Sequence, residues 1–217
     1  MNDVYRVYPK KRLGIFSRFS VTFVLVALNV VFFILASVLL YFNLISLDVI
    51  AISPGHILEG NYLWTFITSM FMHGGLFHLF ANMVSLFFIG TFVERLLGSK
   101  RYVWFYLLSG IFASFLFVLS ALLSPSELGV FAVGASGAIF GLLGLLMLLV
   151  PNLPVYLMFI PIPIKMKYAA PGMLLLLWII SLGNIAHLGG FVAGIGYGLY
   201  LKAKYKNKTL MIRRQFS

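Results

Sequence analysis

The chain has 217 residues, of which 62% are hydrophobic and 10% charged, and its formal net charge is +11. Because soluble domains carry about 25% charged residues, this composition excludes a water-soluble globule and favours an all-α polytopic membrane protein. The absence of cysteine excludes disulfides, thiolate metal sites and a cysteine nucleophile. The excess of basic residues is better explained by loops that orient a membrane protein than by nucleic-acid binding.

Apolar segments long enough for membrane helices recur along the chain, and six spans are predicted: 19–42, 76–93, 102–123, 134–150, 168–182 and 185–201. Residues 43–75, between the first two spans, are expected to form a long outer loop. Four prolines in residues 151–167 favour an interfacial connection over a seventh span. The basic segments 1–18 and 202–217 flank a single domain, 19–201, and no cleavable signal peptide is expected.

The positions of the basic residues predict the orientation of these spans. All 16 Lys and Arg residues lie before the first span, between the second and third, between the fourth and fifth, or after the sixth. With six spans, all these segments lie on one side of the membrane, which the positive-inside rule makes cytoplasmic. We therefore expect a multi-pass protein of the cell membrane with both termini in the cytoplasm.

Four polar residues within the spans are predicted to lie in one layer of the membrane. His78 and Asn82 share a helix face near the start of the second span, Ser136 is near the start of the fourth, and His187 near the start of the sixth. All three spans run from outside to inside, so this layer would open to the outside. Each residue has a simpler explanation, a serine bonded to its own helix or a His or Asn that joins helices. Four such residues at one depth favour a functional site.

Glycines at spacing four explain how these residues could meet. The sixth span contains Gly190, Gly194 and Gly198, and the fourth contains Gly137 and Gly141. Small residues at this spacing let helices approach closely in lipid. Facing glycine stripes would bring Ser136 and His187 together, although the stripes alone indicate only tight packing.

The chemistry that suits this set is acyl transfer. Ser136 would be the nucleophile and His187 its general base, while His78, Asn82 and the backbone N–H of Ser136 would stabilise an oxyanion. No aspartate lies within the spans, so the pattern favours a Ser–His dyad. Phe140, one helical turn after Ser136, is a candidate to stack on His187. No metal-binding pattern is found.

These motifs resemble those of the rhomboid family of intramembrane serine proteases. "GASGAIFG" (134–141), with Gly134 and Gly137 beside the serine, is similar to the family's nucleophile motif. "HLFAN" (78–82) is similar to its oxyanion motif, and "AHLGGFVAGIGYG" (186–198) to the helix that carries its base. The resemblance covers roughly residues 60–200 and has the motifs on the second, fourth and sixth spans.

The resemblance implies the same roles for Ser136, His187, His78 and Asn82, and a role for His73 in supporting the outer loop. It implies cleavage of transmembrane substrates near their outer ends, after lateral entry from the lipid bilayer, without metal or cofactor. A monomer would be sufficient for catalysis. One departure is Thr65, which follows Trp64 where family members often carry arginine.

Two alternatives belong to other functional classes. A catalytically inactive rhomboid-like protein would bind membrane clients without cutting them, and loss of the serine or the histidine would favour it. A small transporter or channel would need a polar path that continues to the cytoplasmic side.

Overall fold

The computed structural model describes residues 20–156, 162–179 and 185–214. Helices account for most of these residues, and two short strands pair in one antiparallel hairpin. In chain order the elements are α1 (Val21–Tyr41), η2 (Leu47–Val49), α2 (Pro54–Leu58), α3 (Thr65–Thr68), α4 (Leu76–Ser85), the π-helical η3 (Leu86–Gly90), α5 (Thr91–Leu97), α6 (Ser99–Ser120), η4 (Pro125–Glu127), α7 (Ser136–Leu149), β1 (Pro154–Val155), β2 (Ile164–Lys165), α8 (Met166–Ile179), α9 (Ile185–Lys204) and α10 (Lys206–Arg214).

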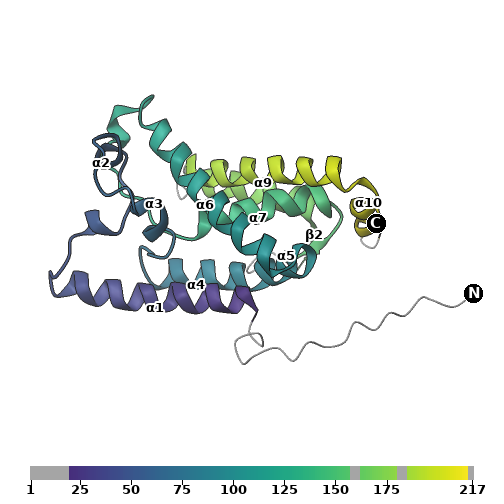
Figure 1. The fold of residues 1–217 in the computed structure, drawn as a ribbon, viewed down its shortest axis with the longest axis horizontal. Helices are drawn as coiled ribbons and strands as arrows, with labels where there is room; N and C mark the ends of the chain where they lie inside the picture. Colours follow the sequence, from purple (N-terminus) through teal and green to yellow (C-terminus); the bar gives the residue numbers. More distant parts are fainter. Residues whose placement is uncertain (1–19, 157–161, 180–184, 215–217) are drawn as a thin grey trace, which may run out of the picture.

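The long helices run side by side, and α7 lies among them in contact with α6, α8 and α9 (Figure 1). The short helices α2 and α3 lie at one end of this bundle, and α10 lies at the other (Figure 1). The helices α4, α7 and α9 all begin at the α2–α3 end. The first residues of these three helices, far apart in the sequence, are thereby brought to one end of the molecule.

Each of the six predicted spans overlaps a helix, but the helix ends differ from the prediction. The predicted segment 1–18, residue 19 of the first span, residues 180–182 of the fifth span and residues 215–217 of the tail lie outside the described residues. The second helix continues through η3 and α5 to Leu97, and the third runs from Ser99 to Ser120 instead of 102–123. Within the described residues, three helices are long and apolar enough to cross a membrane, namely α1, the continuous Leu76–Leu97 helix and α6; α7 and α8 are shorter apolar helices. The number of six crossings therefore stays a prediction.

Two connecting regions contain more regular structure than the sequence suggested. Residues 43–75, expected as a loop, contain η2, α2 and α3. They are joined to the segment before α7 by a bridge between Ile52 and Ala132. In the proline-rich connection, Pro154 pairs with Lys165 and Val155 with Ile164, so an all-helical description is incomplete. Residues 157–161 of this connection lie outside the described part.

A buried carboxylate joins the start of α1 to the α5–α6 turn. Glu94 is 8% exposed, and its oxygens accept hydrogen bonds from the backbone N–H groups of Val21 and Thr22 at 2.8 and 2.9 Å. The hydroxyls of Thr22 and Ser99 donate to the same carboxylate at 2.8 and 2.7 Å. A negative charge at a helix N-terminus is favourable, so this contact stabilises the start of α1 and holds it against the bundle. The Ser20 hydroxyl caps the same turn by accepting from the N–H of Phe23 at 3.2 Å.

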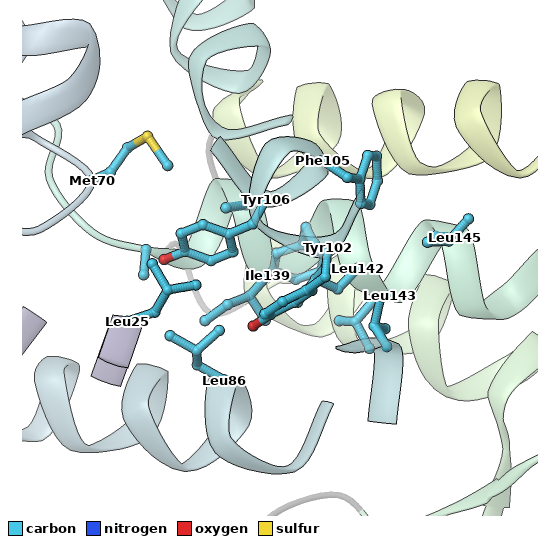
Figure 2. Close-up of a cluster of buried hydrophobic side chains, with 14 of the residues drawn as sticks. Leu25, Met70, Leu86, Tyr102, Phe105, Tyr106, Ile139, Leu142, Leu143 and Leu145 are labelled. Carbon is cyan, nitrogen blue, oxygen red and sulfur yellow. The ribbon is translucent and has the colours of Figure 1, made fainter. Parts of the chain in front are cut away.

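The core is assembled around two tyrosines of α6. Tyr102 and Tyr106 are fully buried and extend from α6 toward Leu25 of α1 and Leu86 of η3 (Figure 2). Ile139 and Leu142 of α7 belong to the same cluster of buried side chains. This packing holds α7 in place below its first turn, where the polar residues are found.

Candidate active site

Ser136 is the first residue of α7, and the chain before it is held by the segment that follows α3. Gly134 has φ +127°, a backbone conformation that L side chains rarely adopt. Its N–H donates to the carbonyl oxygen of Ser69 at 2.8 Å. This turn presents the half-buried Ser136 side chain at the helix N-terminus, where free N–H groups favour a developing negative charge.

His187 lies against Ser136 from the neighbouring helix. It is the third residue of α9 and is 6% exposed. Its Nε2 lies 2.8 Å from the Oγ of Ser136, a hydrogen-bonding distance. The ring of Phe140 contacts the imidazole, with ring centroids 5.0 Å apart and planes inclined by 47°. The candidate nucleophile and base are therefore in direct contact, and the imidazole of the base also packs against the ring of Phe140.

Glycines set the distance between α7 and α9. A Cβ on Gly190 would overlap the carbonyl oxygen of Gly137, and a Cβ on Gly194 would overlap that of Gly141. Gly198 differs, since a Cβ there would meet the side chain of Leu148, at 3.1 Å. The two backbones thus touch along the first half of each helix, and this approach is what allows His187 to reach Ser136.

His78, the third residue of α4, faces the same turn. A Cβ on Gly134 would lie 3.0 Å from the His78 Nε2 and 2.9 Å from its Cε1, so glycine at this position leaves room for the imidazole. The backbone N–H of Gly74 donates to the His78 Nδ1 at 3.2 Å. Because Nδ1 then acts as the acceptor, the hydrogen of a neutral ring is on Nε2, the nitrogen that faces the Ser136 turn.

Asn82 and His73 are connected to His78 in different ways. The Nδ2 of Asn82 donates to the backbone carbonyl of His78 at 2.9 Å, so one of its two amide hydrogens is used within α4. His73 precedes α4, is 1% exposed, and contacts the His78 ring edge-on with centroids 5.2 Å apart. Neither ring nitrogen of His73 makes a hydrogen bond within the described residues.

Burial affects the charge of His73. Removal from water, and secondarily the nearby His78, lower the pKa of His73 to about 4. Its imidazole is consequently neutral at pH 7. A neutral ring in edge contact with His78 adds no positive charge beside the candidate oxyanion donor.

A cavity of about 30 Å³ lies beside Ser136, which is room for about one water molecule. It is lined by hydroxyls as well as apolar groups, since Ser69, Ser114 and Ser136 all face it together with Met70 and Phe117. Met70 closes the cavity next to Gly110, where a Cβ would overlap the methionine side chain. The space beside the serine therefore accommodates only a small group.

Position 65, where the sequence departs from the rhomboid pattern, is buried. Thr65 is 1% exposed, and its hydroxyl donates to the carbonyl oxygen of Tyr62 at 2.7 Å. Two more side chains hold the segment. The Nε1 of Trp64 donates to the carbonyl oxygen of Val49 at 2.8 Å. The hydroxyl of Thr68 donates to the carbonyl oxygen of Ile50 at 3.0 Å. Hydrogen bonds to backbone carbonyls thus hold this region without an arginine.

Two groups of the site were missed by sequence reasoning, the N–H of Gly74 and the carbonyl of Ser69. Both act through the backbone, so residue type carries no signal for them. The only available hint was the short distance in sequence between Gly74 and His78.

Comparison with known proteins places most of the chain within one family. Residues 60–204 match the family model described as the Rhomboid domain. The chain is 34% identical over 168 residues to RHOMBOID-like protein 1 of Arabidopsis thaliana, covering 71% of this chain and 39% of that protein. It is 35% identical over 141 residues to Rhomboid protease GluP of Bacillus subtilis (strain 168), covering 60% and 24%.

A third relative carries a different description. Inactive RHOMBOID-like protein 8 of Arabidopsis thaliana is 31% identical over 144 residues, which cover 62% of this chain and 37% of that protein. The chain spans less than half the length of these three relatives. Similarity alone therefore does not separate a protease from an inactive relative.

Proposed function

Because the chain belongs to the rhomboid family, we propose that it is an intramembrane serine endopeptidase with Ser136 as nucleophile and His187 as general base. Family membership supports an intramembrane protease role, and one relative is named a rhomboid protease. The observation that carries the assignment to residues is the 2.8 Å contact between the Ser136 Oγ and the His187 Nε2. This distance is within reach for proton transfer from hydroxyl to imidazole.

The reaction would proceed in two steps. The His187 Nε2 takes the Ser136 hydroxyl proton while Oγ bonds to the scissile carbonyl carbon, and the carbonyl electrons move to oxygen. Collapse of this intermediate breaks the C–N bond, the amine leaves with the proton from His187, and an acyl-serine remains. In the second step His187 takes a proton from water, and the resulting hydroxide attacks the acyl carbon. The bond between this carbon and the Ser136 Oγ then breaks, His187 returns the proton to Oγ, and the second fragment leaves as a carboxylic acid.

The oxyanion would be held by donors from two helices. The Nε2–H of His78, the second amide hydrogen of Asn82 and the N–H of Ser136 are the candidates, and the N-terminus of α7 adds its dipole. The fixed tautomer of His78 supports its role, because Nε2 donates while Nδ1 is occupied by Gly74. The cavity of about 30 Å³ supports a small side chain next to the scissile bond.

The substrate class follows from the proposed position of the site in the membrane. With six crossings and the basic segments in the cytoplasm, the first residues of α4, α7 and α9 lie near the outer surface. Transmembrane segments entering laterally from the lipid would then be cut near their outer ends. All the proposed catalytic groups belong to one chain, so a monomer is sufficient.

A cleavage assay with a transmembrane substrate in liposomes tests the proposal. Ser136→Ala and His187→Ala should abolish cleavage, while Ser109→Ala should cleave at the wild-type rate. Ser109 is a suitable control because it is also a buried serine, and its hydroxyl donates to a carbonyl oxygen of its own helix, that of Tyr106. Undiminished cleavage by Ser136→Ala would overturn the assignment of the nucleophile.

The second candidate function is an inactive protein that binds membrane clients. The similarity to Inactive RHOMBOID-like protein 8 favours it. It predicts client binding by the wild type and no cleavage under any lipid condition, with Ser136→Ala binding equally well.

A further inference from the structure

The last described helix, α10, exposes an unusual combination of side chains for a helix of nine residues. Leu210 and Met211 are 44% and 66% exposed, and Lys206 and Lys208 are exposed beside them. Thr209, in contrast, is buried against the bundle. A short helix with one docked face and with apolar and basic side chains together on its free face is typical of membrane interfaces.

The residues just before α10 indicate the depth at which it lies. Lys204 donates to the hydroxyl of Tyr200 at 2.7 Å, and its ammonium lies 5.7 Å from the ring centre of Tyr205. Arg101, at the start of α6, lies 5.4 Å from the same Tyr205 ring. Tyrosines and basic residues at helix ends are enriched at the headgroup level of a bilayer. Because α10 begins one residue after Tyr205, it begins at that level.

The basic side chains around α10 have no acidic partner in the described part of the chain. No ion pair there involves a lysine or an arginine. Glu94, near the same end of the bundle, already accepts hydrogen bonds from the start of α1 and from Ser99. The other described carboxylates, of Asp48, Glu59 and Glu127, lie in the segments around η2, α2 and η4, far along the helices from α10. The positive charge near α10 is thus available to an external anion.

We propose that this surface, the α10 surface, binds the headgroups of anionic phospholipids. Leu210 and Met211 would insert between headgroups, and the phosphates would lie against the basic side chains of Arg101, Lys204, Lys206 and Lys208. Lipid is favoured over an acidic protein because the exposed Leu210 and Met211 lie on the helix that follows Tyr200 and Tyr205, at the proposed depth of the headgroups. The surface depends on the proposed membrane embedding but not on the proposed chemistry, since none of its residues belongs to the Ser136 site.

A single fluorescent label tests this surface cleanly because the chain contains no cysteine. Met211→Cys labelled with bimane is reconstituted into vesicles of phosphatidylcholine, with phosphatidylglycerol titrated in. We expect the emission to shift to the blue and to be quenched by brominated lipid as phosphatidylglycerol rises, and the effect to weaken in high salt. Lys206→Gln and Lys208→Gln should each lower the apparent affinity for phosphatidylglycerol about fivefold.

The matched control removes two positive charges outside α10, at the same end of the helix bundle. Lys165→Gln with Lys167→Gln, at β2 and the start of α8, should leave the titration unchanged. The proposal is overturned by equal emission in both lipids, by a shift insensitive to the two α10 lysines, or by a shift that depends on protein density and so reports a second copy.

Native mass spectrometry of the unlabelled protein checks the result without the label. Retained phosphatidylglycerol should decrease in the Lys206→Gln, Lys208→Gln double variant, and equal retention would overturn the proposal.

Discussion

The helices α7 and α8 are each 14 residues long and apolar, but they are buried to very different extents. In α7, 11 of the 14 residues are buried, whereas in α8 only Met166, Ala169 and Ala170 are, all in its first half. The end of α8 is exposed, with Ile179 at 70%. In lipid an apolar side chain gains little by leaving the acyl chains, so hydrophobicity does not decide which helix becomes central.

Small residues explain the difference. The glycines of α7 admit the backbone of α9, whereas a Cβ on Gly172 of α8 would meet nothing within 4 Å. Pro171 also removes a backbone donor inside α8. The proposed catalytic groups lie on α7, α9 and α4, and none lies on the loosely held helix. The proposed nucleophile and base therefore lie on the two helices whose backbones pack most closely.

The largest effect is expected where the α7–α9 contact is broken. Gly190→Ala places a methyl group on the carbonyl oxygen of Gly137 and should lower the free energy of unfolding by about 3 kcal/mol or more, the upper range of overpacking. Gly196→Ala, on the same helix with open space around it, should be neutral or stabilising by up to about 1 kcal/mol. Unfolding in detergent measures both, and equal stabilities would contradict the account of α7.

The next effect concerns the proposed oxyanion donor, which faces the turn before α7. His78→Ala should lower the rate of cleavage by about 10²–10³-fold without loss of folded protein. The reason is that an Nε2–H directed at the developing charge is removed. Single-turnover cleavage with the matched variant His56→Ala, in α2, provides the comparison. A wild-type rate in His78→Ala would remove this residue from the site.

The tautomer of His78 gives a finer test of the same donor. Gly74→Pro removes the N–H that donates to Nδ1, whereas Gly74→Ala retains it, and a Cβ there would lie 3.7 Å from Nδ1, an ordinary contact. We expect lower kcat in the proline variant with little change in KM. ¹⁵N-histidine spectra should show the Nε2–H form in wild type and in Gly74→Ala. The account of His78 fails if proline changes neither the spectrum nor kcat.

How much of this arrangement the sequence predicts depends on the kind of contact. Ser136 and His187 were predicted to meet because side-chain type, glycine spacing and span direction are all written in the sequence. The hydrogen bonds between Glu94 and the start of α1 were not predicted, since they join a carboxylate to backbone N–H groups more than 70 positions away in the sequence. Contacts of that kind leave no periodic pattern. The short helices within 43–75 and the β1–β2 hairpin were missed for another reason, because elements of two to five residues are too short to show a hydrophobic period.

Acid should lower the free energy of unfolding through His73, which lies in the loop that leads into α4. The pKa of His73 is lowered to about 4 by burial, so between about pH 4 and its unfolded value of 6.5 the unfolded chain binds more protons than the folded one. The stabilisation is complete above pH 6.5 and is lost as pH falls toward 4, amounting to at most about 3 kcal/mol. Unfolding at several pH values should show a larger loss in wild type than in His73→Gln, because the half-buried His78 and the buried His187 are present in both proteins. Identical pH profiles for the two proteins would contradict it.

The smallest effect is expected on α8. Leu176→Ala removes a side chain that is 45% exposed, and it should change the free energy of unfolding by no more than about 0.5 kcal/mol. Leu142→Ala, a fully buried leucine of α7, should cost about 2–5 kcal/mol in the same assay. Similar losses for the two variants would mean that α8 is held as firmly as α7.

The central claim is that Ser136 is activated by His187, and a fluorophosphonate probe tests it most directly. The probe is applied to detergent-solubilised wild type, Ser136→Ala and His187→Ala, each shown to be folded, and again after reconstitution into liposomes. The account predicts covalent labelling of the wild type alone, because only a serine with a base in contact attacks the phosphorus. Absence of labelling of folded wild type in both detergent and liposomes, or equal labelling of Ser136→Ala, would contradict it.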